Sequence, residues 1–455
     1  MHKLPAPELQ RRFQKDGADF IFGLRAEFGD AVYADVPLIG RVTLLFHPDH
    51  AYELLVKHAD QTQKPPLMRK LLGPSFGNGL FTSEGDLWKH QRRLIQPTFH
   101  HAKIGRFAGQ MIQHSAALSS TWRAGEIVTI DAAMHALTFT IAIDTLFTSD
   151  GSSDAALIGE SMGILGKGLA AQSRNIFLAL LPEWLPVAEM TKKRQAVETI
   201  NTVIHQMVAA RRALGEDASP PDLLSALVFS RDADTHETMS DAQLRDELMT
   251  LFIAGHETTA VLMAWAWILL ADHPAVAATL HAELDAVLDG RDPTLADVPR
   301  LPYTAQVIHE ALRLYPPSWM LFRTPLAPIT VGEVPLNTGG IAFIFPYANQ
   351  RDARWFDQPD AFLPERWTPD YEKALPKGAY FPFGMGPRVC IGNGFAQLEA
   401  TLLLATLANR WTFTRLDTPE LLPGGATLGF AHPVRMRVDP RGSTSRTTPN
   451  IGAHP

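Results

Sequence analysis

Apolar side chains recur every three to four positions along most of this chain and alternate strictly with polar ones in only a few short stretches. The first repeat is typical of helices that bury one face, and the second of half-buried strands. Helical periodicity dominates residues 104–284, and alternation is confined to residues 31–46 and to short segments after residue 320. The pattern therefore predicts a mainly α-helical fold with a small β-rich region.

Start and stop signals place the outer elements. A helix over about 11–28 ends at Gly29, and a Pro-Leu-Ile-Gly turn joins strands over 31–36 and 41–46 into a hairpin. His47 and Pro48 open the next helix, so His47, His50 and His58 are predicted to be surface histidines rather than metal ligands. Further short strands are expected over 329–331 and 341–344. The polar residues 441–455 predict a disordered tail after a single domain over 1–440.

The longest predicted helix runs from about Ser240 to Ala271. Ser240 is a good N-cap, and Gln243 occupies the capping-box position. Gly255 in the middle costs about 1 kcal/mol relative to alanine. Either a ligand lies against the helix at this point or a neighbouring helix packs closely there. Thr258 can bond the carbonyl four residues earlier or turn its hydroxyl to a ligand.

Composition narrows the class of protein. Apolar residues make up 46% of the 455, which permits a large core, and 41 basic against 48 acidic residues give a net charge of −7. This balance argues against a nucleic-acid-binding protein. One cysteine excludes an intramolecular disulfide and fits a reducing compartment. Residues 1–20 contain no apolar signal segment, and no uncharged stretch is long enough for a membrane span, so we expect a cytoplasmic protein.

The single cysteine lies in a glycine-rich segment, residues 383–392, just before a helix-like run over 395–403. A lone cysteine is usually a small buried hydrophobe. A cysteine at the start of a helix, however, meets unpaired N–H groups and the positive end of the dipole, which favour the thiolate. With the cationic Arg388 nearby, such a thiolate would suit a soft metal with an anionic periphery.

The spacing Phe-x-x-Gly-x-Arg-x-Cys-x-Gly resembles the haem-binding loop of the cytochrome P450 family. It matches at Phe383, Gly386, Arg388, Cys390 and Gly392. The resemblance implies a triangular helical domain that holds haem b, with Cys390 as the axial iron ligand and the rest of the loop, including Gly384, against the cofactor.

A second motif, Ala254-Gly255-x-Glu257-Thr258, resembles the oxygen-activation motif of the same family. It implies that Ala254 and Gly255 lie beside the haem. Glu257 and Thr258 would pass protons through water to bound dioxygen. The His256-Glu257 pair does not indicate a zinc hydrolase, because Ala260 stands where a second histidine is required.

Two further patterns gain meaning from the resemblance. Trp88 and Arg92 lie on one helix face and alone would indicate a surface cation–π contact. In this family they imply contact with a haem propionate, as does Arg323. Glu310 and Arg313, with Arg366 from the later segment Pro-Glu-Arg-Trp, match the family's Glu-Arg-Arg cluster, which would lock the cysteine loop rather than react.

Residues 61–86 form a long, partly apolar connection, which is either a pocket cover or a loop packed on the core. The resemblance places it over the substrate, with residues 163–186 as part of a mobile lid. The predicted pocket residues are Leu71, Phe76, Leu80, Phe252, Trp319, Met320, Leu321 and Leu428.

The implied function is monooxygenation of an apolar compound by O2, such as a terpenoid, carotenoid or fatty acid. Electrons would come from a separate ferredoxin or flavodoxin with its reductase, and we expect a monomer. A basic group could steer an acidic partner or be only a solvated face: Lys89, His90, Arg93, His100, His101, Lys103 and Arg106.

Three alternatives remain open. A peroxide-driven peroxygenase of the same fold is disfavoured by the intact Glu257-Thr258 pair. A haem sensor or electron carrier would not need that acid–alcohol pair, and an interaction protein would not need the cysteine loop. The carbon monoxide difference spectrum of the reduced protein separates most of these.

Overall fold

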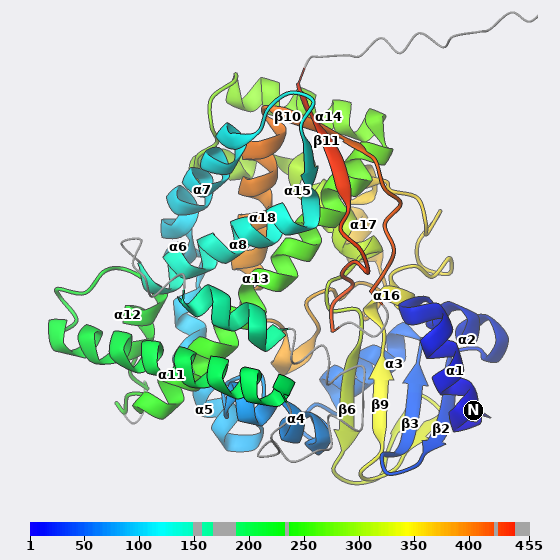
Figure 1. Cartoon of the computed structure of the whole chain (residues 1–455). Coiled ribbons are helices and arrows are strands. Elements are labelled where there is room, and N and C mark those ends of the chain that lie inside the picture. Colours follow the sequence, from blue (N-terminus) through cyan, green and yellow to red (C-terminus); the bar gives the residue numbers. More distant parts are fainter. Residues whose placement is uncertain (149–156, 167–187, 233–235, 423–425, 442–455) are drawn as a thin grey trace, which may run out of the picture.

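A computed structural model of the chain describes residues 1–148, 157–166, 188–232, 236–422 and 426–441. Helices make up most of the molecule, and a sheet lies beside them at the lower right of Figure 1 with α1 and α2 on its outer side. The predicted mainly α-helical fold with a small β-rich region is therefore confirmed. The single domain over 1–440 stays a prediction.

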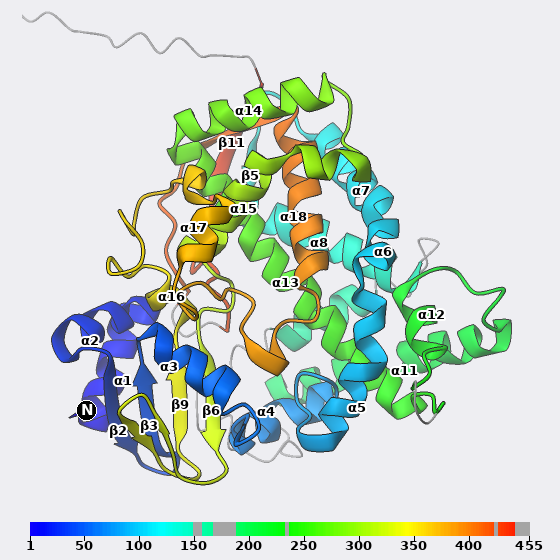
Figure 2. The ribbon, with the colours of Figure 1, turned by 180° about the vertical axis from the view of Figure 1, so that it is seen from behind.

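The core is built around α13 (Asp241–Asp272), which runs through the middle of the molecule in Figures 1 and 2. Every residue from 259 to 270 of this helix is buried, as expected for a helix that is apolar on all sides. It packs against α8 (Ile130–Phe147), α15 (Pro302–Leu314) and α18 (Asn393–Ala408). The cysteine loop leads directly into α18.

The predicted start of α13 is confirmed, because the Ser240 hydroxyl accepts from the Gln243 N–H and the Gln243 side chain accepts from the Ser240 N–H. The other helices are all shorter than α13, and α11 is the longest of them within the described residues. They are α1 (Ala6–Asp16), α2 (Phe20–Phe28), α3 (Pro48–Tyr52), α4 (Pro66–Phe76), α5 (Gly85–Ile95), α6 (His101–Ile104), α7 (Ala108–Thr121), α11 (Ala188–Leu214), α12 (Leu223–Val228), α14 (Pro274–Leu288), α16 (Pro346–Asn349) and α17 (Pro369–Ala374).

The main sheet has the order β1-β2-β3-β9-β6-β4. The predicted hairpin forms between β2 and β3, with Ala31 opposite Leu45, and β9 joins β3 in parallel from 300 residues later, with Ile341 opposite Val42. The strands are β1 (His2–Lys3), β2 (Ala31–Val36), β3 (Gly40–Leu45), β4 (Thr62–Gln63), β6 (Leu321–Pro325) and β9 (Ile341–Ile344). Two smaller sheets contain β5 (Ile127–Thr129), β10 (Trp411–Arg415) and β11 (Arg435–Pro440), and β7 (Ile329–Val331) with β8 (Val334–Leu336).

Two local predictions are wrong. The single helix over 11–28 is two helices, because Gly17 adopts a positive φ of 55° after α1 and ends it. The connection over 61–86 is not entirely a loop. Pro66 opens α4 at a position where the missing N–H costs nothing, and Gly77 at φ 64° closes it. Most of the predicted lid over 163–186 lies outside the described residues.

His47 caps α3, because its Nδ1 accepts from the Asp49 N–H at 3.1 Å. Within the described ranges no three His, Cys, Asp or Glu side chains gather as metal ligands. Two helices, Ile130–Phe147 and Asp241–Asp272, are long and apolar enough to cross a membrane by length and composition. Each of them contains charged residues, such as Asp131 and Asp144 in the first and Glu257 in the second, so neither is an uncharged stretch of that length. Both helices are mostly buried in the core, which is the usual reason for such composition.

Candidate functional site

The cysteine loop is held in shape by backbone contacts. The Cys390 N–H donates to the Phe383 carbonyl at 2.9 Å, and Gly384 and Gly386 have φ of 72° and 70°. A Cβ on Gly386 would lie 2.2 Å from the Leu55 carbonyl oxygen, so only glycine fits there. Cys390 is exposed and lies three residues before α18. The loop therefore presents the thiol at the start of a core helix.

The protein does not by itself favour the Cys390 thiolate. The side chain keeps accessible surface, but burial around the sulfur raises the pKa of the thiol. A hydrogen bond from the Gly392 N–H and the charge of Arg92 only partly oppose this. The expectation from the helix start alone is therefore wrong in net direction. A bound metal ion would have to displace the proton, as is usual for thiolate ligands.

One turn of α13 is open although the helix is otherwise central. Ala254 and Gly255 are exposed, and a Cβ added to Gly255 would meet no atom within 4 Å. Close helix packing therefore does not explain this glycine, and space beside the helix does. Thr258 lies on the same face, and its hydroxyl donates to the Ala254 carbonyl at 2.8 Å.

Thr258 is hydrogen-bonded within its own helix, whereas the Glu257 carboxylate is hydrogen-bonded to a residue outside it. Glu257 Oε1 accepts a hydrogen bond from the Thr427 hydroxyl at 3.0 Å. His135 lies on α8, the helix that packs against α13, and is near enough for the charge of Glu257 to act on it. Burial lowers the pKa of His135, and the negative charge of Glu257 partly opposes that shift. The acid of the predicted motif therefore lies between a C-terminal turn and α8.

Four cations gather on one side of the cysteine loop: Lys64, Arg92, Arg323 and Arg388. Arg92 Nη1 donates to the Val389 carbonyl at 2.7 Å. Burial, with the nearby charge of Arg388, lowers the pKa of Arg323 to about 10 and that of Lys64 to about 7. Like charges held together with so little water favour an anionic ligand among them.

Among the described residues, Glu84 is the acid whose charge acts on Lys64, Arg323 and Arg388 alike. It forms an ion pair with Arg388. The Arg388 guanidinium also lies 4.1 Å from the centre of the buried Trp88 ring. Trp88 is therefore stacked by Arg388 rather than by Arg92, and Arg92 reaches the cysteine loop instead. Lys64 and Glu84 were not identified from the sequence, because they belong to no motif.

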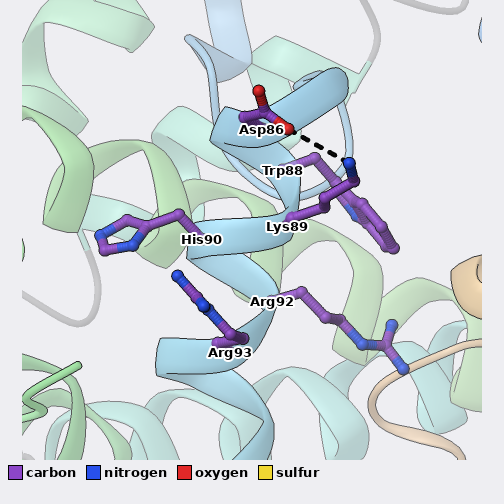
Figure 3. A pocket seen from close by; sticks show the side chains of 6 residues that line it. All are labelled: Asp86, Trp88, Lys89, His90, Arg92 and Arg93. Atoms are coloured by element: carbon purple, nitrogen blue, oxygen red, sulfur yellow. Dashed lines mark hydrogen bonds and ion pairs between the residues drawn. The ribbon is translucent and has the colours of Figure 1, made fainter. Parts of the chain in front are cut away.

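The charged side chains of helix α5 point to different sides of the helix. In Figure 3, Arg92 points away from His90 and Arg93, and all three side chains are among those that line an open hollow along this helix. Lys89 pairs with Asp86 at 3.1 Å. His90 and Arg93 each lie 3.3 Å from a carboxylate oxygen of the buried Asp232. Part of the predicted basic group is therefore already neutralised.

The predicted Glu-Arg-Arg cluster is assembled. Arg313 donates to both Glu310 oxygens at 2.8 and 2.7 Å, and Arg366 Nε donates to Oε1 at 3.0 Å. Neither Glu310 nor Arg313 is accessible to solvent. Trp367 Nε1 adds a fourth donor at 2.8 Å. Arg313 also donates to the Gln350 carbonyl.

Gln350 connects this cluster to the segment before the cysteine. Its Oε1 accepts from the Phe381 N–H at 3.0 Å, two residues before the loop begins. A disturbance of the Glu310 cluster would therefore reach the loop through one residue.

The predicted pocket residues lie in different parts of the fold. Phe252 is buried on α13, and its ring centre lies 5.2 Å from that of His256. The Leu80 N–H donates to Glu247 of the same helix at 2.9 Å, and Leu428 is tied to α13 through Trp265. Trp319 instead lies in the sheet core, 6.1 Å from Phe345. Phe76 is buried, and Leu71, Met320 and Leu321 are half-buried.

Three features of this arrangement suit haem. They are an open turn on a central helix, an accessible thiol on the helix packed against it, and a cation cluster for an anionic edge. The residues present therefore fit a flat cofactor with a soft metal and carboxylate substituents.

Comparisons with known proteins agree with this geometry. A family model described as Cytochrome P450 matches residues 8–433. The chain is 39% identical to cyclooctatin synthase of Streptomyces melanosporofaciens, with 88% of this chain and 86% of that protein covered. It is 31% identical to pentalenene oxygenase of Streptomyces avermitilis, with 80% and 79% covered.

Solved structures give the same result. The crystal structure of the cytochrome P450DA heme domain superposes with a TM-score of 0.83 at 25% identity, covering 93% of this chain and 94% of that one. A second structure, of the cytochrome P450 CYP102L1, superposes with a TM-score of 0.80 at 22% identity and supports the fold.

Proposed function

The chain belongs to the cytochrome P450 family, and from this premise we propose that it hydroxylates a cyclic terpenoid with electrons from a separate redox partner. Membership confirms the enzyme class, an oxidoreductase of the monooxygenase type, and a haem held by a cysteine thiolate. Since the sequence contains one cysteine, that ligand is Cys390. The redox partner, the substrate class and the individual residue roles are the proposal.

One observation carries the proposal. The sole cysteine lies at the start of α18, and α18 packs against α13, whose turn at Ala254 and Gly255 is open. A cofactor held by Cys390 would therefore lie near the segment of α13 that carries Glu257 and Thr258. A sensor or electron carrier gains nothing from an acid and an alcohol at that place.

The cation cluster would hold the carboxylates of the cofactor. Arg92, Arg323 and Arg388 provide planar donors suited to carboxylate, and Lys64 adds a point charge. Burial and, after it, the charge of Arg388 lower the pKa of Arg323 and of Lys64, and bound propionates would oppose both shifts. The Glu310 cluster would fix the loop and take no part in the reaction.

When bound, haem with a thiolate ligand supplies the oxygen chemistry. The chain supplies binding, orientation and protons. Thr258, whose hydroxyl now donates to the Ala254 carbonyl, would hold a water on the open face. Glu257 would deliver the proton to that water. The apolar residues Phe252, Leu80 and Leu428 would orient the substrate and exclude further water.

The substrate class rests on the relatives. Cyclooctatin synthase, cyclooctat-9-en-7-ol 5-monooxygenase and pentalenene oxygenase are 39%, 34% and 31% identical to this chain. A carotene epsilon-monooxygenase is 28% identical. These names favour a cyclic terpenoid over the carotenoid and fatty acid that the sequence left open.

For the remaining points we keep the earlier expectations as proposals: a ferredoxin or flavodoxin with its reductase as electron source, a monomer, a single domain over 1–440 and a cytoplasmic location. The basic residues of α5 and α6 support an acidic redox partner.

The test is spectroscopic and then catalytic. Reduced holoprotein should give the carbon monoxide difference band of thiolate-ligated haem, and Cys390→Ser should lose that band while its melting remains cooperative. A panel of cyclic terpenoids is then screened by the shift of the haem spectrum, and hits are incubated with ferredoxin, its reductase and NADPH. Turnover with peroxide alone, and none with the redox partner, would favour the peroxygenase instead.

A further inference from the structure

The carboxylate of Glu257 is held by a residue that belongs to neither motif. Thr427 donates to its Oε1 at 3.0 Å from 170 positions along the chain. Within the described part of the chain, Thr427 is the only residue that hydrogen-bonds this carboxylate. The acid is therefore fixed by one contact from outside its own helix.

That contact holds Glu257 away from the open face of α13. Thr258 shares its face with Ala254, to whose carbonyl it donates at 2.8 Å. Neighbouring residues on a helix do not face the same way. The carboxylate on Thr427 and the hydroxyl of Thr258 therefore point to different sides, and the direction of Glu257 depends on Thr427.

The turn that contains Thr427 also forms part of the predicted pocket. Leu428 follows at once and is buried. Its carbonyl accepts from Trp265 Nε1 of α13 at 2.8 Å, and its N–H donates to the Pro317 carbonyl at 3.1 Å. Two hydrogen bonds therefore connect the turn over 426–430 to α13, one at Glu257 and one about two helical turns later at Trp265.

We propose that Thr427 is a positioning residue for Glu257, so that the turn bounding the substrate pocket sets where the acid of the proton pathway points. This inference rests on the proposed function. A ligand pressing on Leu428 moves the preceding residue, Thr427, and with it the hydrogen bond on Glu257. Proton delivery is thereby tied to the presence of substrate.

The experiment uses the holoenzyme and compares the two hydrogen bonds that connect this turn to α13. Thr427→Val removes the hydroxyl and keeps the shape of the side chain. Trp265→Phe removes the other donor and keeps an aromatic ring stacked on Tyr315, whose ring centre lies 3.7 Å away. The readouts are product and hydrogen peroxide per NADPH consumed, haem content, and amide hydrogen exchange over 426–430.

We expect Thr427→Val to raise the share of reductant lost as peroxide about tenfold, the order that one hydrogen bond to a charged group supports. Haem content and exchange over 426–430 should stay as in the wild type, and Thr427→Ser should restore coupling. Trp265→Phe should loosen the turn in hydrogen exchange without a comparable loss of coupling. If Thr427→Val does not accumulate as holoprotein, Thr427→Ala replaces it.

A double variant isolates the route of the effect. If Thr427 acts through Glu257, Thr427→Val should change nothing further in a Glu257→Gln background. Additive effects, wild-type coupling in Thr427→Val, or equal uncoupling by Trp265→Phe would overturn the proposal. Failure of the proposed function is recognised separately, as a wild-type protein that lacks the thiolate band or forms no product.

Discussion

At the scale of single residues, Thr258 shows how a helix can bind a hydroxyl group that remains available to a ligand. Its hydroxyl donates to the Ala254 carbonyl at 2.8 Å, on a turn in the middle of α13 where Ala254 and Gly255 are exposed. A bond of this kind is weak support for a helix, since the carbonyl is already bonded in the helical ladder. The hydroxyl can therefore be exchanged to a water or ligand at small cost.

Thr258→Ala should therefore leave the fold intact and damage proton delivery. Alanine is the better helix former, so we expect no loss of melting temperature. Substrate should still shift the haem spectrum, but product per NADPH should fall about tenfold or more and peroxide should rise. Thr140 of α8 makes the same bond to the carbonyl four residues before it, at 2.9 Å on an exposed face. Thr140→Ala with the same uncoupling would contradict this role.

The reactive residues could be predicted from sequence because their chemistry demands fixed spacing within one segment. Cys390, Glu257 and Thr258 each belong to such a segment. Lys64, Glu84 and Thr427 could not be predicted. They reach the site from segments that only the fold brings near, and no local pattern distinguishes a lysine beside two prolines or a threonine in a turn.

At the scale of elements, the Glu310 cluster joins α15 to the segment that precedes the cysteine loop. Glu310 accepts from Arg313, Arg366, Trp367 and the Leu363 N–H, all within 3.0 Å. A buried carboxylate with this many donors is well satisfied. Removing a charged partner leaves it underpaired, whereas removing a neutral donor costs one hydrogen bond.

Two substitutions in this cluster should therefore lower the free energy of unfolding by different amounts. Arg313→Ala should lower the free energy of unfolding by about 3–5 kcal/mol and reduce haem content. Trp367→Phe keeps the ring and loses only the Nε1 donor, so we expect about 1.5–3 kcal/mol. Urea unfolding of both holoproteins gives the comparison. A phenylalanine variant as unstable as the alanine variant would show that packing of the indole, not its hydrogen bond, is what matters.

The contact between α13 and the segment after α4 predicts a dependence on pH. Glu247 is fully buried, and its Oε2 accepts from the Leu80 N–H while Oε1 has no partner. Burial raises the pKa of Glu247 to about 8, and burial also raises that of Glu399 to about 8. An unfolded glutamate titrates near pH 4.3.

The folded state therefore keeps protons that the unfolded state has released between about pH 4.3 and pH 8. The free energy of unfolding should fall as pH rises through this window and level off above it. Glu247→Gln should remove about half of this contribution and stabilise the protein at pH 8 by roughly 2–4 kcal/mol. Urea unfolding at pH 6 and pH 8 measures it. The exposed Glu216→Gln serves as control, and a wild-type slope in Glu247→Gln would refute the assignment.

Among the elements, the sequence predicted those with strong local signals. The capping box at Ser240 and the hairpin of β2 and β3 are where expected. The break at Gly17 was missed because apolar periodicity continues across it into α2. Helix α4 was missed because Gly73 and Pro74 inside it lower its helical propensity, and contacts with the rest of the fold outweigh that.

For the whole molecule, charge is distributed unevenly. The chain has a net charge of −7, yet basic side chains are concentrated on α5 and α6. Arg93 and His90 are paired with Asp232, and Lys89 with Asp86. Lys103 of α6 is exposed and forms no ion pair within the described residues. Its charge is therefore not offset by a carboxylate of the described residues.

Lys103→Glu should therefore slow the reduction of the holoenzyme by an acidic redox partner, because attraction between the two surfaces speeds their encounter. The effect should be largest at low salt and shrink toward physiological ionic strength, where the screening length is about 8 Å. Stopped-flow reduction at several salt concentrations measures it. Lys15→Glu, on exposed α1 beside the sheet, changes the net charge equally and is the control. Equal slowing by both variants would mean that total charge acts, and that the basic residues near α5 are only a solvated face.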